Sequence, residues 1–202
     1  MANATATSPS TPAKADRRPV RERLLASADE LFYREGINNV GIDRILEHAG
    51  VAKASLYSTF GSKDELVRAY LEGRQDTRRA RIERHLAGKR SPRERVLAVF
   101  DAQAEAMGQP DFRGCAFLMA TVEQPGESRG KPVCDDYREW IRALFVQLVT
   151  EAGVRKPEPL ARQLLLLYDG ATVAAQMDGA GAEGATAARA TAAALLDAAA
   201  KK

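Results

Sequence analysis

The sequence is poor in the residues on which metal sites, disulfide frameworks and β-sheets depend. Two of its 202 residues are cysteines, Cys115 and Cys134, and their separation suits neither a metal site nor a disulfide framework. Aromatic residues make up 6% of the chain, and valine and isoleucine do not alternate with polar residues as they do in strands. We therefore expect no sheet, no structural metal and a reducing environment.

Signatures of catalysis are also missing. Neither of the two histidines, His48 and His85, has an HExxH, a GxSxG or a clustered metal pattern around it. The Asp135-Asp136 pair suits the first turn of a helix, where negative charge is favourable, better than acid–base chemistry. We predict a protein that is not an enzyme, with no catalytic residue, no cofactor and no metal.

Long apolar runs are absent too. No stretch approaches the roughly 20 apolar residues that span a bilayer. Residues 1–15 lack the apolar segment of a signal peptide, and residues 1–16 have the low complexity of a disordered tail. These features predict a cytoplasmic protein without a membrane partner.

What the chain does contain is alanine-rich, helix-forming sequence. Apolar residues make up 45% of it, and many are alanines, which lose no side-chain entropy in a helix. Ser62 and Glu65 are spaced as a capping box, and Ser91 precedes a proline that suits a first helical turn. We predict an all-α fold of about nine helices, over residues 19–35, 42–49, 53–60, 62–85, 91–107, 115–123, 133–152, 158–178 and 182–199.

Charge is distributed unevenly along the chain. Residues 14–95 contain 19 basic and 13 acidic residues, whereas the remainder contains 11 basic and 14 acidic ones. A basic front half is typical of a protein that meets a polyanion, although ordinary solvated helices give the same count. We therefore take a polyanion, such as a nucleic acid, as a candidate partner of the front half of the chain.

Two short helices in the basic part have the pattern of a helix-turn-helix. Ile42, Ile45, Leu46 and Ala49 make one apolar face, Gly50 supplies the turn and Val51 is placed to close it. On the second helix Leu56 and Phe60 are expected inside, which leaves polar and basic side chains for a DNA groove. A packed helical hairpin with no partner is the alternative.

Residues 24–66 resemble the DNA-binding head of the TetR-type repressors. The segment AGVAKASLYSTFGSKDEL is similar to that family's AGVSKGTLYHHFxSKEEL at nearly every structural position. The resemblance implies three head helices, a helical body, a homodimer and a palindromic operator of double-stranded DNA. It divides the chain into a disordered tail over residues 1–16, a helix-turn-helix DNA-binding domain over 17–61 and a helical regulatory and dimerisation domain over 62–202. It also implies the candidate DNA contacts, which are Lys53, Ala54, Ser55, Tyr57, Ser58, Thr59, Lys63 and Arg44.

Two positions depart from the family pattern. A threonine commonly caps the second helix and a serine the third, but this chain has Gly41 and Ala52. Both substitutions remove a hydroxyl, and the second costs the helix about 1 kcal/mol. We expect DNA binding to depend more strongly on Lys53, Tyr57 and Lys63.

The second half of the chain resembles one branch of the same family, in which a GC pair begins the sixth helix. The matching segments are RGCAFLMATVE, residues 113–123, and LLLLYDGATVAAQ, residues 164–176. The resemblance places a dimer interface on the helix that carries Gly170, Ala171, Ala174 and Ala175, with the alanine-rich last helix as its second element. Packing within one chain is the alternative.

A ligand pocket in such a body is lined by apolar and aromatic side chains. The candidates, each of which is otherwise ordinary core, are Phe100, Met107, Phe112, Phe117, Met119, Tyr137, Trp140, Phe145, Tyr168 and Gln176. Cys115 is a candidate redox sensor, or alternatively a small core residue. The predicted function is a dimeric repressor that a small apolar ligand releases from its operator; the alternative is a non-sensing adaptor that retains a DNA-binding head.

Overall fold

The computed structural model describes residues 17–179 and 181–199, so the predicted tail lies outside it. Over that range the chain forms nine helices and no strand, which confirms the all-α prediction. No helix in this range is long and apolar enough to cross a membrane. The helices are α1 (Val20–Glu35), α2 (Ile42–Ala49), α3 (Lys53–Phe60), α4 (Lys63–Leu86), α5 (Pro92–Met107), α6 (Ala116–Glu123), α7 (Lys131–Glu151), α8 (Pro157–Asp178) and α9 (Gly181–Ala199).

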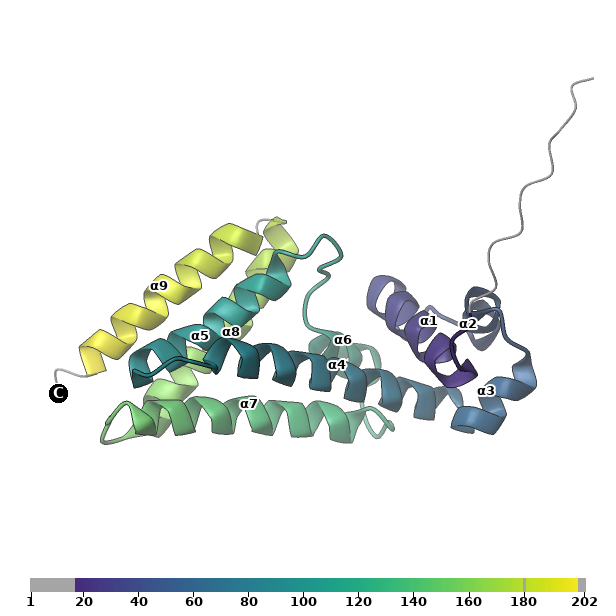
Figure 1. Cartoon of the computed structure of the whole chain (residues 1–202), viewed down its shortest axis with the longest axis horizontal. Coiled ribbons are helices and arrows are strands. Elements are labelled where there is room, and N and C mark those ends of the chain that lie inside the picture. Colours follow the sequence, from purple (N-terminus) through teal and green to yellow (C-terminus); the bar gives the residue numbers. More distant parts are fainter. Residues whose placement is uncertain (1–16, 180, 200–202) are drawn as a thin grey trace, which may run out of the picture.

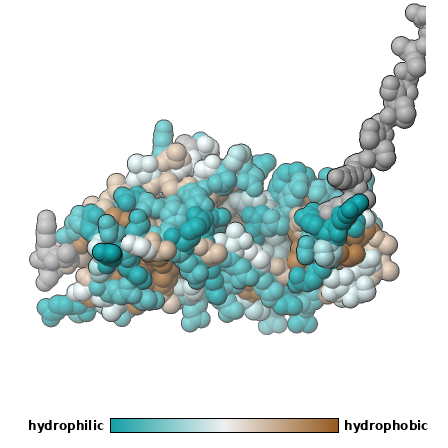
Figure 2. Space-filling model, in the orientation of Figure 1, coloured by the Kyte–Doolittle hydropathy of each residue, from teal (hydrophilic) through white to brown (hydrophobic). Residues whose placement is uncertain are grey.

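The molecule is elongated, with a three-helix head at one end and α9 at the other (Figure 1). The long helix α4 runs from the head into the body, where it packs against α5 and α7. Helices α5, α8 and α9 pack together at the far end, and α6 lies between this body and the head. The surface drawn in Figure 2 is mostly hydrophilic, with small apolar patches over both the body and the head.

One buried apolar cluster extends through head and body. Phe32 of α1 packs edge-on against Tyr70 of α4, with 5.5 Å between ring centroids, and Phe100 and Phe145 meet at 5.8 Å in the body. Full burial of such a side chain is worth about 1.5–3 kcal/mol. The predicted domain boundary after Gly61 falls at the end of α3, within this continuous core.

Helix starts follow the predicted capping residues, with one difference. Ser62 accepts a hydrogen bond from the backbone N–H of Glu65 at 3.1 Å, as expected. The Glu65 carboxylate instead accepts a hydrogen bond from Arg68 Nε at 2.7 Å, so the predicted box is half formed. A complete capping box occurs at the start of α5, between Ser91 and Glu94.

Candidate nucleic-acid interface and body cavity

The turn between α2 and α3 depends on a glycine. Gly50 has φ 61° and ψ 41°, a left-handed conformation that costs other residues energy. The N–H of Val51 donates to the carbonyl of Leu46 at 3.1 Å and closes the corner. Arg23 of α1 donates to the carbonyl of Ala49 from Nε at 3.0 Å and from Nη2 at 2.7 Å. Sequence reasoning missed Arg23, because its contact joins residues 26 apart.

Helix α3 presents most of the predicted DNA-binding residues to the surface. Leu56 is fully buried and Phe60 half-buried, whereas Tyr57 is 46% exposed. The exposed hydroxyls of Ser58 and Thr59 donate to the carbonyl of Ser55 at 3.1 and 2.6 Å. A bond of this kind holds the hydroxyl on its own helix until a better acceptor arrives. Ala54 is also exposed, and Ser55 is half-buried.

Ion pairs hold two of the predicted basic contacts near the surface. Lys53 Nζ lies 3.4 Å from Asp43 Oδ1, which brings together the first turns of α2 and α3. Arg44 is half-exposed, and its Nη2 lies 3.6 Å from Glu35 Oε1. Exposed pairs of this kind contribute little stability, so both cations can exchange partners.

Lys63 is placed differently. Its ammonium donates to the carbonyl of Ile37 at 2.7 Å and lies 5.8 Å from the Phe32 ring centroid. Burial lowers the pKa of this lysine. The side chain therefore ties the loop after α1 to α4, and it must leave Ile37 before it can reach a phosphate.

Helix α6 is attached to the head at both of its ends. At its start, the Tyr33 hydroxyl donates to the carbonyl of Gly114 at 3.0 Å and accepts from the N–H of Arg113 at 2.9 Å. At its end, the Glu123 carboxylate accepts from the N–H of Asn38 at 3.0 Å. These residues lie 80 or more positions apart in the chain, and no local sequence signal identifies them.

A cavity of about 400 Å³ lies in the body, beside α6. In its wall the rings of Phe117 and Tyr137 stack, 4.0 Å between centroids and 12° between planes. The Tyr137 hydroxyl accepts a hydrogen bond from Arg78 Nη1 at 2.6 Å, and Cys115 Sγ lies 3.6 Å from the same nitrogen. The lining consists of Arg78, Cys115, Phe117, Leu118, Thr121, Cys134, Asp135, Tyr137, Arg138, Tyr168, Asp169, Thr172 and Val173.

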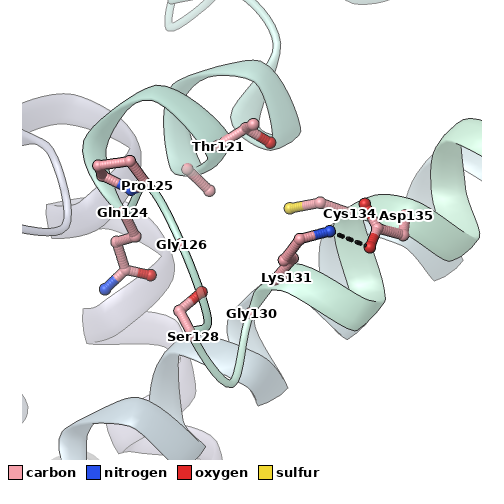
Figure 3. A pocket seen from close by; sticks show the side chains of 10 residues that line it. Thr121, Gln124, Pro125, Gly126, Ser128, Gly130, Lys131, Cys134 and Asp135 are labelled. Atoms are coloured by element: carbon pink, nitrogen blue, oxygen red, sulfur yellow. Dashed lines mark hydrogen bonds and ion pairs between the residues drawn. The ribbon is translucent and has the colours of Figure 1, made fainter.

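A second hollow of about 270 Å³ shares Thr121, Cys134 and Asp135 with this cavity. Figure 3 shows it between the end of α6, the loop after it and the start of α7, with Lys131 hydrogen-bonded to Asp135. The loop is held close to α4, because a Cβ on Gly130 would lie 2.8 Å from Leu71 Cδ1.

The predicted pocket residues fall into several environments. Phe117, Tyr137, Tyr168 and Cys115 line the cavity, while Met107 and Phe112 line a small crevice on the other side of Arg78. The remaining candidates lie outside the lining of the main cavity. Phe100 and Phe145 are buried against Tyr168, Trp140 lies under the guanidinium of Arg79, Met119 is half-buried, and Gln176 is exposed beside Gly114.

Sequence reasoning missed Arg78, one of four charged residues in the cavity wall. The sequence does contain a signal for this position. Leu71, Gln75 and Ile82 are the buried residues of this part of α4, and Arg78 lies on the same face of the helix by its spacing. A charged residue on a buried helix face points to a function. The arginine-rich composition of α4 concealed this position among solvent-facing charges.

Burial divides the four residues predicted for the dimer interface. Ala171 and Ala175 are buried within the protomer, at 6% and 4% exposure, as expected of packing inside one chain. Gly170 is exposed, with no atom within 4 Å of a Cβ placed on it, and Ala174 is half-buried. Leu166, Val173 and Met177 lie exposed on the same side of α8 as Gly170, at helical spacing.

Comparisons with known proteins agree on one family. The sequence model of the bacterial regulatory proteins of the tetR family matches residues 24–70. The structure resembles that of SCO4454, a TetR-family transcriptional regulator from Streptomyces coelicolor, with a TM-score of 0.84, 31% identity and coverage of 90% of this chain and 96% of the other. A putative TetR regulator from Streptomyces avermitilis gives a TM-score of 0.77, 36% identity and coverage of 90% and 98%.

Among curated relatives, the transcriptional repressor NemR of Escherichia coli K12 is 32% identical over 105 residues, 51% of this chain and 53% of NemR. The chain thus spans about half the length of the curated relatives it matches.

Proposed function

Since the chain belongs to the TetR family of transcriptional regulators, which are not enzymes, we propose that it is a repressor that binds a palindromic operator as a homodimer. A small molecule that enters the cavity beside α6 releases it. The observation that carries this proposal is the exposed polar face of α3, held against α1 and α2 by the turn at Gly50. In a helix-turn-helix the second helix enters the major groove with its first residues at the base edges.

DNA binding is assigned to the first turns of α2 and α3 and to the exposed side of the rest of α3. Lys53 and Arg44 exchange their carboxylate partners for phosphates, and Tyr57 and Thr59 face the groove. Such phosphate contacts position the head and make the affinity depend on salt. Lys63 adds a contact only if it gives up the carbonyl of Ile37.

The dimer interface is assigned to the exposed side of α8 together with α9. Three large apolar side chains lie on that side, including Leu166 at 63% and Met177 at 79% exposure. A two-fold contact through Gly170 lets the two helices approach closely, because glycine has no side chain to separate them. The two heads would then meet half-sites about 34 Å apart.

Coupling between ligand and DNA is assigned to α6. Its residues Cys115, Phe117 and Thr121 line the cavity, while its two ends are hydrogen-bonded to the head. A ligand that displaces α6 therefore moves the head, and a ligand that prefers the displaced state shifts the population towards it.

The DNA-binding proposal is tested by gel retardation of a fragment upstream of the chain's own coding sequence. Lys53→Ala and Tyr57→Ala should weaken binding. Lys53→Ala should also reduce the slope of log K against log salt by roughly 2, because the dimer loses one phosphate contact from each protomer. Lys89→Ala, at an exposed site in the α4–α5 loop, is the control with the same change in charge. Equal weakening by Lys89→Ala, or no retardation of any palindromic fragment at low salt, would refute the proposal.

The dimer is tested by introducing a charge at an open position. Gly170→Glu should dissociate the dimer in light scattering, while the helical circular dichroism of the protein stays unchanged. Gly73→Glu is the matched control, because a Cβ on Gly73 of α4 also meets no atom within 4 Å. An intact Gly170→Glu dimer would place the interface elsewhere.

Sensing through Cys115 is a second candidate, favoured by its position in the cavity beside the Arg78 guanidinium. N-Ethylmaleimide should then abolish operator retardation in the wild type and leave Cys115→Ser unaffected. The remaining alternative, a non-sensing adaptor, predicts retardation that neither this reagent nor any small molecule alters.

A further inference from the structure

We propose that the ligand of the body cavity is a monocarboxylate with an apolar or aromatic body, and that the Arg78 guanidinium binds its carboxylate. The inference rests on the proposed function in one respect, that this cavity is the effector site.

Arg78 differs in its partners from three other arginines of α4. Arg74 donates to Asp29 at 2.9 Å, Arg84 donates to Glu105 at 2.9 Å, and Arg81 lies 3.7 Å from the same glutamate. In the part of the chain that the structure describes, no carboxylate pairs with Arg78, whose contacts are a phenol, a thiol and two aromatic rings. Arg79 also pairs with no carboxylate among the described residues, but it lies over the Trp140 ring and outside the lining of this cavity. A cation placed among apolar groups without a counter-ion is costly, and an anionic ligand removes that cost.

The two phenols nearest to Arg78 do not act as its counter-ion. Burial raises the pKa of both Tyr137 and Tyr168, so at neutral pH these phenols are uncharged. Among the described residues, the hydrogen bonds of Arg78 all come from Nη1, so Nε and Nη2 have no acceptor. Neither of these two nitrogens is sealed away as a buried donor without a partner. They are available to the two oxygens of a carboxylate, the geometry that a guanidinium matches.

The rest of the cavity favours an apolar body with a single charge. Phe117, Tyr137 and Tyr168 provide aromatic walls, and Leu118 and Val173 add apolar surface. The two acidic residues of the lining are already paired, Asp135 with Lys131 and Asp169 with Arg138 at 2.6 Å. Arg78 is therefore the uncompensated charge of the lining, and additional negative charges on a ligand would face these two carboxylates.

The test measures binding of two probes of nearly equal shape to the full-length protein at pH 7. The probes are 1-naphthoate and its neutral counterpart 1-naphthamide, and binding is followed by calorimetry and by the fluorescence of Trp140, whose ring centroid lies 6.1 Å from that of Tyr137. We expect naphthoate to bind tighter by a factor of about 10 or more, the size typical of a charge-assisted hydrogen bond.

Variants locate that preference. Arg78→Gln should lower the naphthoate affinity to that of naphthamide. Arg78→Lys keeps the positive charge but cannot donate two parallel hydrogen bonds, so it should lower the naphthoate affinity by a smaller factor. Arg142→Gln removes an exposed cation of α7 that lies outside this lining, and it should leave the preference unchanged. Circular dichroism checks that each variant is folded. If Arg78→Gln does not fold, the comparison of Arg78→Lys with the wild type tests the inference.

Four results would overturn the inference. They are equal affinities of the two probes for the wild type, an unchanged naphthoate affinity in Arg78→Lys, a preference that is lost in Arg142→Gln, and displacement of naphthoate by equimolar inorganic phosphate. Operator retardation by the same proteins separates this inference from the proposed function. Naphthoate binding that depends on Arg78 but leaves DNA retardation unchanged would count against release by the ligand and in favour of the carboxylate site.

Discussion

Tyr33→Phe tests the attachment of α6 to the head with the loss of a single oxygen atom. The Tyr33 hydroxyl joins α1 to the segment before α6 by two hydrogen bonds, to the carbonyl of Gly114 and from the N–H of Arg113. The ring itself stays in place under the Arg74 guanidinium, 3.9 Å from its centroid. The substitution therefore removes both bonds and preserves the packing.

The expected magnitude follows from the groups left behind. Tyr33 is 9% exposed and Gly114 is buried. A buried backbone group that loses its partner costs about 1–3 kcal/mol. For a chain of this length, a loss of about 2 kcal/mol lowers the unfolding midpoint by roughly 4–8 °C.

The assay combines thermal unfolding with hydrogen exchange at the Arg113 amide, the donor to Tyr33. Both the midpoint and the protection of that amide should fall. Tyr70→Phe is the control, because Tyr70 is a buried tyrosine at the same junction whose hydroxyl bonds to no described residue. Unchanged protection of Arg113, or an equal loss in Tyr70→Phe, would refute the reasoning. If the attachment carries coupling, any weakening of operator binding by 1-naphthoate should also be smaller in Tyr33→Phe.

Three further predictions concern local energetics. Ala52→Ser restores a capping hydroxyl at a residue that already has the extended backbone of an N-cap. It should stabilise the protein by about 1 kcal/mol and raise the unfolding midpoint in calorimetry by about 2–4 °C. No rise would mean that the start of α3 does not limit stability. Gly130→Ala should destabilise the protein by about 1–3 kcal/mol in urea titration, because its Cβ would overlap the fully buried Leu71, whereas an unchanged midpoint would mean that the loop yields freely. Hydrogen bonds from Arg84 and His85 lower the pKa of Glu105 to about 2. Since folding lowers this pKa, the ionised Glu105 carboxylate stabilises the protein at pH values above its ordinary pKa of 4.5. That stabilisation is lost as the pH falls towards 2. The stability of Glu105→Gln should therefore fall less steeply than that of the wild type over this window, and parallel curves would contradict it.

The sequence by itself determined the helices and the helix-turn-helix. Each helix start and stop depends on neighbours within one turn, as at Ser62, Ser91 and Gly50, and such local rules are readable in a string of letters. The apolar spacing of α2 likewise identifies its buried face, which Ile45, Leu46 and Ala49 form.

Tertiary structure decided what the buried and exposed positions do. Ala171 and Gly170 are adjacent in sequence, yet one is buried within the protomer and the other is open, because α9 packs on one side of α8 only. The partners of Tyr33 and of Arg78 lie 37 to 81 residues away in the sequence. Such contacts depend on how helices cross, which no single helix encodes, because many crossings satisfy the same apolar stripe. The arrangement of the helices therefore places Arg78, one of several arginines of α4, in the lining of the body cavity.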